Sequence, residues 1–272
     1  MKFRKTAVIL CLAVLAASFS ACSNSGSPSS KKDSASATSV NQSASKGDKT
    51  FKIDLATAYA GNGPAGKAMQ RFVDDVKKKS GGSIEISLFT DGTLGTTTDN
   101  YTSVASGNLD MTMSGLEGLD LYAPEYTFLD CPFLIKSKDH LQKLLNSGIG
   151  EKLKKKYEDN GLVTLGWHNR DIRELASNKE VKAPADVKGL KLRLPGMTIY
   201  VDAWKTLGVT STTVAMNELY TALQTKVAES CEGGYEQMDT LKLYEVQKYI
   251  AETDHVYEFV GLYIIIRSFI TR

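Results

Sequence analysis

The sequence has few of the residues from which metal sites and nucleophile sites are built. It contains three histidines and four cysteines in 272 residues. No two histidines lie three or four residues apart, and neither an HExxH nor a CxxC pattern occurs, so we expect no metal site. The GxSxG, GxGxxG and phosphate-loop patterns are also missing, and these patterns place a nucleophile or a phosphate. We therefore expect no cofactor and no enzymatic activity.

An excess of one charge is missing as well. Three of the 33 Lys and Arg residues lie within the first five positions, so residues 22–272 carry 30 basic and 31 acidic side chains. A near-neutral chain offers no basic surface to nucleic acid, and we expect no such partner. Past residue 22 the only cysteines are Cys131 and Cys231, too few for a disulfide framework. Two buried thiols are predicted, with a disulfide between them as the alternative.

The N-terminus has the pattern of an export signal. Basic residues within positions 1–5 precede an apolar run at 6–17, which is too short to span a bilayer. Small residues and then Cys22 follow, in an arrangement that resembles a lipobox, where the cysteine thiol takes the lipid. The alternative is a plain signal peptide cleaved near Ala21. We predict a lipoprotein signal peptide over residues 1–21 and lipid attachment at Cys22.

Residues 22–50 are expected to form a flexible tether. The stretch consists mainly of Ser, Ala, Lys, Asn, Gly and Thr, and it buries too little apolar surface to offset the entropy of ordering it. A flexible chain of this length typically reaches roughly 30 Å. We predict an exported protein whose folded part is held at the outer face of the cytoplasmic membrane, or in the periplasm, by its lipid anchor.

From residue 51 onward, strand-like and helix-like segments alternate, which predicts an α/β fold with helices covering the sheets. A helix is expected over 137–159 with a break at 146–148, and another over 197–207 with Ile199, Trp204 and Leu207 facing inward. The other predicted strands are 51–57, 84–89, 109–113, 162–167, 172–177, 190–194, 227–231 and 262–266. The other predicted helices are 64–79, 97–106, 217–225 and 234–248.

Two arginines lie within strand-like segments. Arg193 stands between Leu192 and Leu194, and Arg173 lies in the run IREL. Composition alone favours side chains that face solvent, and the alternative is burial beside an anionic partner. A guanidinium is suited to a bidentate clamp on a carboxylate. Two such groups converging on a cleft would therefore bind an organic anion.

Residues 171–196 resemble the central signature of a family of transport proteins. The run APADVKGLKLRLP at 183–195 is similar to the tPeDlkGlKiRvP signature of the substrate-binding proteins of tripartite ATP-independent periplasmic (TRAP) transporters, the DctP-like family. The resemblance covers about residues 51–262. Further motifs of the family occur in the same order, namely TLG at 93–95, SGNLD at 106–110, CPFL at 131–134, LGV at 207–209 and NELYTALQT at 217–225.

The resemblance implies a two-lobe, periplasmic-binding-protein-like (type II) fold with a hinged cleft between the lobes. It implies lobe 1 over residues 51–170, lobe 2 over 171–256 and a return towards lobe 1 over 257–272. Members of this family usually continue for several dozen residues more. We therefore expect this chain to be truncated at its C-terminus.

The resemblance also implies the ligand site. The family holds a ligand carboxylate with the arginine that corresponds to Arg193, and its second strand arginine corresponds to Arg173. Glu232 matches an acidic residue of the family, but Gly233 stands where a polar residue often follows it. Trp204 is expected in the core rather than at the ligand. The other candidate pocket residues are Tyr59, Thr96, Ser114 and Met216.

The function that the resemblance implies is the solute-binding component of a TRAP-type secondary transporter. Such a component captures a small organic carboxylate, either C4-dicarboxylate-like or a sugar acid, and delivers it to integral-membrane permease subunits. One alternative is an ABC-type solute-binding lipoprotein, whose site need not use the two strand arginines. An exported hydrolase and a receptor-like sensor are the alternatives from other functional classes.

Overall fold

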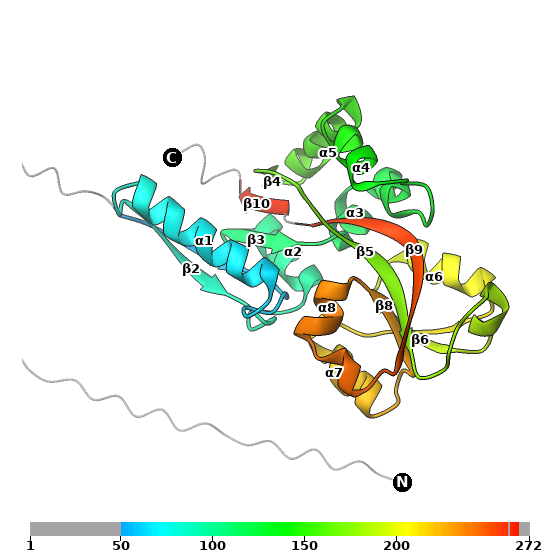
Figure 1. Cartoon of the computed structure of the whole chain (residues 1–272). Coiled ribbons are helices and arrows are strands. Elements are labelled where there is room, and N and C mark those ends of the chain that lie inside the picture. Colours follow the sequence, from blue (N-terminus) through cyan, green and yellow to red (C-terminus); the bar gives the residue numbers. More distant parts are fainter. Residues whose placement is uncertain (1–49, 261, 267–272) are drawn as a thin grey trace, which may run out of the picture. The chain divides into compact units, whose positions relative to one another are not determined.

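Two five-stranded sheets form the framework of the chain in the computed structural model, which describes residues 50–260 and 262–266 (Figure 1). The first sheet has the order β2-β1-β3-β10-β4, with strands β1 (Phe51–Ala56), β2 (Ile84–Phe89), β3 (Met111–Ser114), β4 (Leu162–Thr164) and β10 (Leu262–Ile266). The second has the order β7-β6-β8-β5-β9, with strands β5 (His168–Ser177), β6 (Lys191–Leu194), β7 (Thr210–Thr213), β8 (Ser230–Gly233) and β9 (Tyr249–Val260). The predicted signal peptide, Cys22 and nearly all of the predicted tether lie outside the described residues.

Helices connect most of these strands. The α-helices are α1 (Pro64–Lys79), α2 (Thr97–Ser106), α3 (Glu117–Tyr122), α4 (Lys138–Leu145), α5 (Gly148–Asp159), α6 (Thr198–Thr206), α7 (Leu219–Gln224) and α8 (Tyr235–Thr240). Four short 3-10 helices are η1 (Pro124–Asp130), η2 (Pro184–Val187), η3 (Met216–Glu218) and η4 (Leu243–Glu245). Among the described residues, no helix combines the length and the apolar character that crossing a membrane requires.

Each sheet contains three neighbouring parallel strands, β2-β1-β3 in the first and β7-β6-β8 in the second. Parallel neighbours need a crossover connection, and α1, α2, α6 and α7 supply it. The remaining strands pair antiparallel. The predicted α/β class is confirmed. The parallel strands of each sheet have their carboxyl ends at the same edge, which is where open α/β sheets bind ligands.

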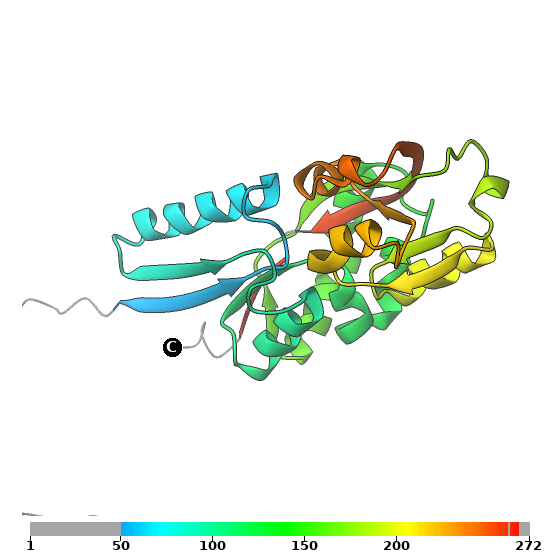
Figure 2. The same cartoon turned by 90° about the horizontal axis from the view of Figure 1, so that it is seen from below.

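Helix α1 illustrates how closely a local pattern determined an element. Its bounds are those predicted from apolar spacing, and Pro64 occupies the first turn, where a missing N–H is tolerated. Met69 and Val73 are its buried apolar residues, and Val73 packs in a cluster with Ile84 and Ile86. Figure 2 shows the helix lying along strands β1 and β2. Three lysines in the last turn complement the negative end of the helix dipole.

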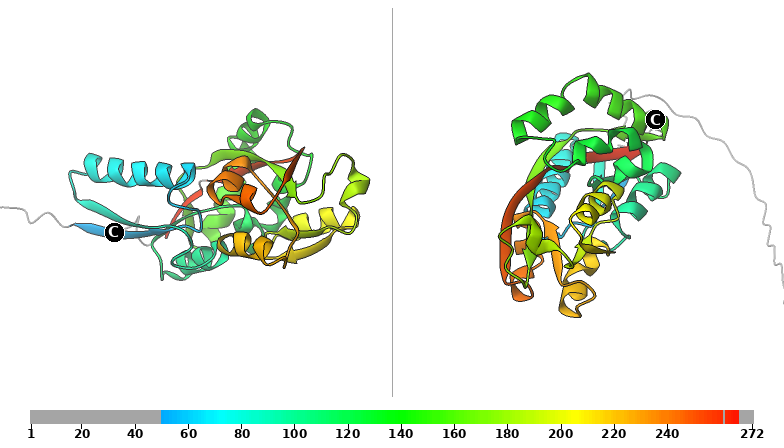
Figure 3. Two further views of the ribbon diagram at one scale, coloured as in Figure 1. Left: turned by 60° about the horizontal axis from the view of Figure 1, so that its bottom comes forward. Right: turned by 90° about the vertical axis from the view of Figure 1, so that its right-hand side faces the viewer.

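Strands β5 and β9 join the two sheets. Strand β4 ends at Thr164 in the first sheet and β5 begins at His168 in the second, while β9 ends at Val260 and β10 resumes in the first sheet. The two long strands pair antiparallel and curve side by side, as Figure 1 and the right-hand view of Figure 3 show. Two adjacent connections therefore link the sheets, and β10 is the strand predicted at 262–266.

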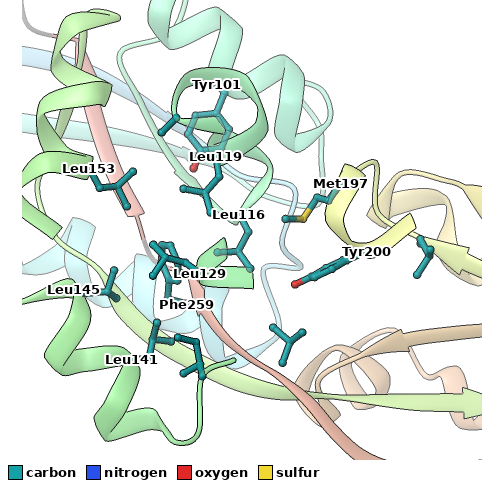
Figure 4. Packing of buried hydrophobic residues seen from close by; sticks show 14 of the residues in the cluster. Tyr101, Leu116, Leu119, Leu129, Leu141, Leu145, Leu153, Met197, Tyr200 and Phe259 are labelled. Atoms are coloured by element: carbon teal, nitrogen blue, oxygen red, sulfur yellow. The ribbon is translucent and has the colours of Figure 1, made fainter. Parts of the chain in front are cut away.

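The largest apolar cluster draws residues from the segments around both sheets, and Figure 4 shows ten of them labelled, including Leu116 and Phe259. Tyr200 and Trp204, one helical turn apart on α6, are its contribution from that helix. Trp204 is therefore a core residue, as predicted. Leu207, predicted to face inward, is 42% exposed; it follows the last residue of the helix and lines a large open cavity.

Two further predictions differ from the structure. The helix predicted over 234–248 ends at Thr240, because Lys242 adopts a left-handed conformation (φ 53°) that an α-helix cannot contain. Strands β7 and β9 were not predicted. Cys131 and Cys231 are both free thiols, but only Cys231 is fully buried, and burial raises its pKa to about 12.

Candidate carboxylate-binding site

A small cavity collects polar side chains that belong to segments of both sheets. The space open to the centre of a water molecule is about 10 Å³, which is room for about one water. Tyr59 and Glu117 follow the carboxyl ends of β1 and β3, and Arg193 lies near the carboxyl end of β6. The full lining is Tyr59, Leu116, Glu117, Arg173, Arg193, Pro195, Met197, Met216, Gln237 and Glu258.

Arg193 is a buried cation without an acidic partner. Arg193 is 2% exposed, and its Nε donates a hydrogen bond to the carbonyl oxygen of Val214 at 2.8 Å. None of the ion pairs between described residues includes Arg193. Burial lowers the pKa of this guanidinium, and the charge of Arg173 lowers it further, against the opposing effect of Glu232. The remaining guanidinium nitrogens are suited to an anion that the described residues do not supply.

Arg173 is equally buried but fully compensated. Its Nε and Nη2 donate to the two carboxylate oxygens of Glu232, the second at 2.7 Å, and its Nη1 donates to Glu258 at 2.7 Å. His255 also contacts the Glu232 carboxylate, at 3.2 Å. Burial alone would raise the pKa of Glu232, but the Arg173 charge and the hydrogen bonds from His255 and Arg173 outweigh burial and lower it to about 2. Glu232 therefore stays ionised and holds Arg173 in place.

A third arginine, Arg170, extends this network. Its Nε donates to Glu236 at 3.1 Å and its Nη1 to Glu258 at 3.2 Å, while the guanidinium lies 4.6 Å from the ring centre of Tyr59. The other oxygen of Glu236 accepts a hydrogen bond from the backbone N–H of Ala65, at the start of α1. This chain of contacts connects a helix that packs on the first sheet to strands of the second.

The structure brings four of the seven predicted ligand residues to the cavity, namely Tyr59, Arg173, Arg193 and Met216. The other three have different partners. Thr96 caps α2, since its hydroxyl accepts from the Asp99 N–H and donates to the Asp99 carboxylate. Ser114 shares a 2.7 Å hydrogen bond with Thr112, and Glu232 faces Arg173. The ligand role of all seven residues stays a prediction.

Sequence reasoning missed Glu117, Gln237 and Glu258 in the cavity lining. Gln237 lies in the segment predicted as one long helix, and Glu258 lies on β9, which was not predicted. The run HVYEFV at 255–260 contains four apolar residues with one acid among them. A buried acid in such a run requires a cation, and this was the signal that could have linked Glu258 to a strand arginine.

A larger cavity lies elsewhere, and it is not the candidate site. It measures about 990 Å³, and its lining includes Trp204, His255, Phe133, Val187 and Ile250. No arginine lines it. The smaller cavity is the better candidate because it places a buried guanidinium in the same lining as the unpaired amide of Gln237. The described residues contain no group of three or more His, Cys, Asp or Glu side chains that could hold a metal ion.

These features are those of an α/β protein with two sheet-centred lobes and a buried polar cavity between them. The family model of the bacterial extracellular solute-binding proteins, family 7 (DctP), matches residues 55–267. The chain belongs to this family, and the resemblance to TRAP solute-binding proteins is confirmed. The family and the fold are those of substrate-binding transport proteins.

Individual relatives give the extent of the similarity. The 2,3-diketo-L-gulonate-binding periplasmic protein YiaO of Escherichia coli is 32% identical over 191 residues, which are 70% of this chain and 58% of that protein. The sugar acid binding protein DctPAm from Advenella mimigardefordensis, solved with galactonate, has a TM-score of 0.78 and 27% identity, covering 82% of this chain and 72% of that one.

A TRAP periplasmic solute-binding protein from Sulfurospirillum deleyianum, solved with succinate, has a TM-score of 0.77 and 27% identity, with the same two coverages. The first curated relatives are longer than the matched region. The chain spans between 38% and 62% of their length.

Proposed function

We propose that this protein is the extracytoplasmic solute-binding component of a TRAP-type secondary transporter, and that it captures a small organic carboxylate for integral-membrane permease subunits. One observation carries the proposal: the buried guanidinium of Arg193 lines a polar cavity and has no acidic partner among the described residues. An isolated buried charge is costly. A ligand carboxylate would remove that cost by accepting paired, charge-assisted hydrogen bonds.

The cavity volume implies a moving site. Room for about one water is too little for an organic acid, so binding requires the segments around the two sheets to separate and then close on the ligand. Closure would exclude water and strengthen the contact between Arg193 and the carboxylate. The permease would then receive the closed form. We further propose export of the chain and lipid attachment at Cys22, which metabolic lipid labelling of the protein and of a Cys22→Ser variant would test.

Isothermal titration calorimetry with a panel of sugar acids and short dicarboxylates tests the proposal. Replacing Arg193 by Met keeps the length and removes the charge. Truncating one partner of a buried charge pair typically costs about 2–5 kcal/mol, so affinity for every ligand in the panel should fall about 30-fold or more.

The matched control is Lys191→Met, because Lys191 lies on the same strand but is exposed beside Glu229. This variant should bind like the wild type. Equal affinity of the Arg193→Met protein and the wild type would refute the proposed site.

A further inference from the structure

Gln237, on α8, is a second unsatisfied group in the same cavity. The residue is 3% exposed, and neither Nε2 nor Oε1 of its amide has a hydrogen-bond partner among the described residues. A buried amide that is left without hydrogen-bond partners costs about 1–3 kcal/mol. Of the side chains that line the cavity, this is the one with both a donor and an acceptor buried and unpaired.

The absence of a side chain at Gly233 leaves the space that this amide occupies. A Cβ atom added at Gly233 would lie 3.0 Å from both Nε2 and Oε1 of Gln237. Such a contact is closer than carbon and a polar atom normally approach, so even alanine at position 233 would displace the amide. Gly233, which departs from the family pattern, therefore leaves room for the buried amide of Gln237.

The charges around the cavity limit what the rest of the ligand can be. Arg173 and Arg170 are paired with carboxylates of the chain, whereas Arg193, which also lines the cavity, has no such partner within residues 50–260 and 262–266. Glu258 and Glu117 line the same cavity. A second ligand carboxylate would face these acids without a free cation, and like charges at close range repel.

From this arrangement, and resting on the proposed function, we infer that the ligand is a hydroxylated monocarboxylate whose carboxylate meets Arg193 and whose hydroxyl meets Gln237. A hydroxyl both donates and accepts hydrogen bonds, so it can satisfy the Oε1 and the Nε2 of the amide. An ionised carboxylate only accepts and would leave Oε1 unpaired. Tyr59 supplies a further donor, because burial raises the pKa of its hydroxyl and keeps it protonated.

Calorimetry with ligands of matched size tests the inference. D-Erythronate has one carboxylate and three hydroxyls, L-malate has two carboxylates and one hydroxyl, and succinate has two carboxylates and none. Galactonate and galactarate form the corresponding six-carbon pair. The monocarboxylate of each set should bind the wild-type protein most tightly, by about tenfold or more, since a buried polar group left unpaired costs about 1–3 kcal/mol.

Variants of Gln237 separate recognition from folding. Gln237→Met should weaken binding of the hydroxylated monocarboxylate about tenfold or more and change succinate binding less than about threefold. Thermal unfolding of the ligand-free variant should not occur at a lower temperature, because the amide that is lost has no hydrogen-bond partner in the part of the chain that the structure describes. Gly233→Ala should give the same selective loss by displacing the amide. The matched control, Gln224→Met, changes an exposed glutamine on α7 and should leave binding unchanged.

The two proposals fail in different ways. If no carboxylate binds, or if Arg193→Met does not weaken binding, the proposed function is wrong. If Arg193 matters but succinate binds as tightly as erythronate, or if Gln237→Met weakens both equally, the function stands and the inference about Gln237 is overturned.

Discussion

Two buried arginines on either side of β8 show two different uses of the same side chain. Arg173 on β5 is 3% exposed and Arg193 on β6 is 2% exposed. Arg173 has two carboxylates of the chain as partners, whereas Arg193 has one backbone carbonyl. A buried charge that the chain compensates contributes to the fold. A buried charge that it leaves uncompensated is available to a ligand, and the following predictions test that distinction.

The largest effect is expected at Arg173. Arg173→Met would leave Glu232 and Glu258 buried without their cation, and breaking a buried ion pair in this way typically costs about 3–5 kcal/mol. We expect the free energy of unfolding at pH 7, measured by urea denaturation, to fall by about that amount. A loss below about 1 kcal/mol would mean that the network does not stabilise the fold.

The free energy of unfolding at low pH should depend on the same network of ion pairs. The pKa of Glu232 is about 2 in the folded chain, compared with an ordinary value of 4.5. Between these values the unfolded chain binds a proton that the folded chain does not, so stability is lost as the pH falls from about 4.5 towards 2. Urea denaturation at pH 7, 5 and 3 should show part of this loss, about 2 kcal/mol by pH 3. The Glu232→Gln variant should be less stable than the wild type at pH 7. Its free energy of unfolding should lack this part of the pH dependence.

Arg193 should behave in the opposite way to Arg173. Arg193→Met removes a hydrogen bond to Val214, worth about 1 kcal/mol, and also removes an uncompensated buried charge. We expect the free energy of unfolding of the ligand-free protein to stay within about 1 kcal/mol of the wild type. A loss as large as that of Arg173→Met would show that Arg193 stabilises the fold in the same way as Arg173, and that the two arginines do not have different roles.

The smallest effect is expected on the exposed part of the same strand. Lys191 and Glu229 approach to 3.6 Å, with about half of each side chain exposed. Solvent-exposed pairs are typically worth about 0.2–1 kcal/mol, so Lys191→Ala should barely change the midpoint of urea denaturation. A larger change would mean that burial is not what separates strong from weak pairs in this sheet.

Elements whose structure follows from spacing within a short segment were predicted well. The bounds of α1 and β2 are as predicted, and the break at 146–148 separates α4 from α5. In each case the apolar period and the flanking Pro, Gly or Asn residues lie in the segment itself. Strand β9 and the early end of α8 were missed, because they depend on pairing with β5 and on one left-handed residue, Lys242.

The candidate site shows the same division. Motifs indicated which strand arginines to examine, but composition alone favoured solvent for both, and this was wrong, since both are buried. Nor did the sequence distinguish a compensated arginine from an uncompensated one. The acids that decide this lie 59 and 85 residues after Arg173, on strands whose faces are set only when the sheet assembles.

By itself, the sequence determined the α/β class, the helices with regular apolar spacing and the family to which the chain belongs. Tertiary structure decided that Glu232 and Glu258 meet Arg173. It also decided that Arg193 forms no ion pair among the described residues and that Gln237 fills the space left at Gly233. The physical reason is range: helix periodicity and turn preferences act over a few residues, whereas charge compensation in a core depends on groups that only the folded chain brings within hydrogen-bonding distance.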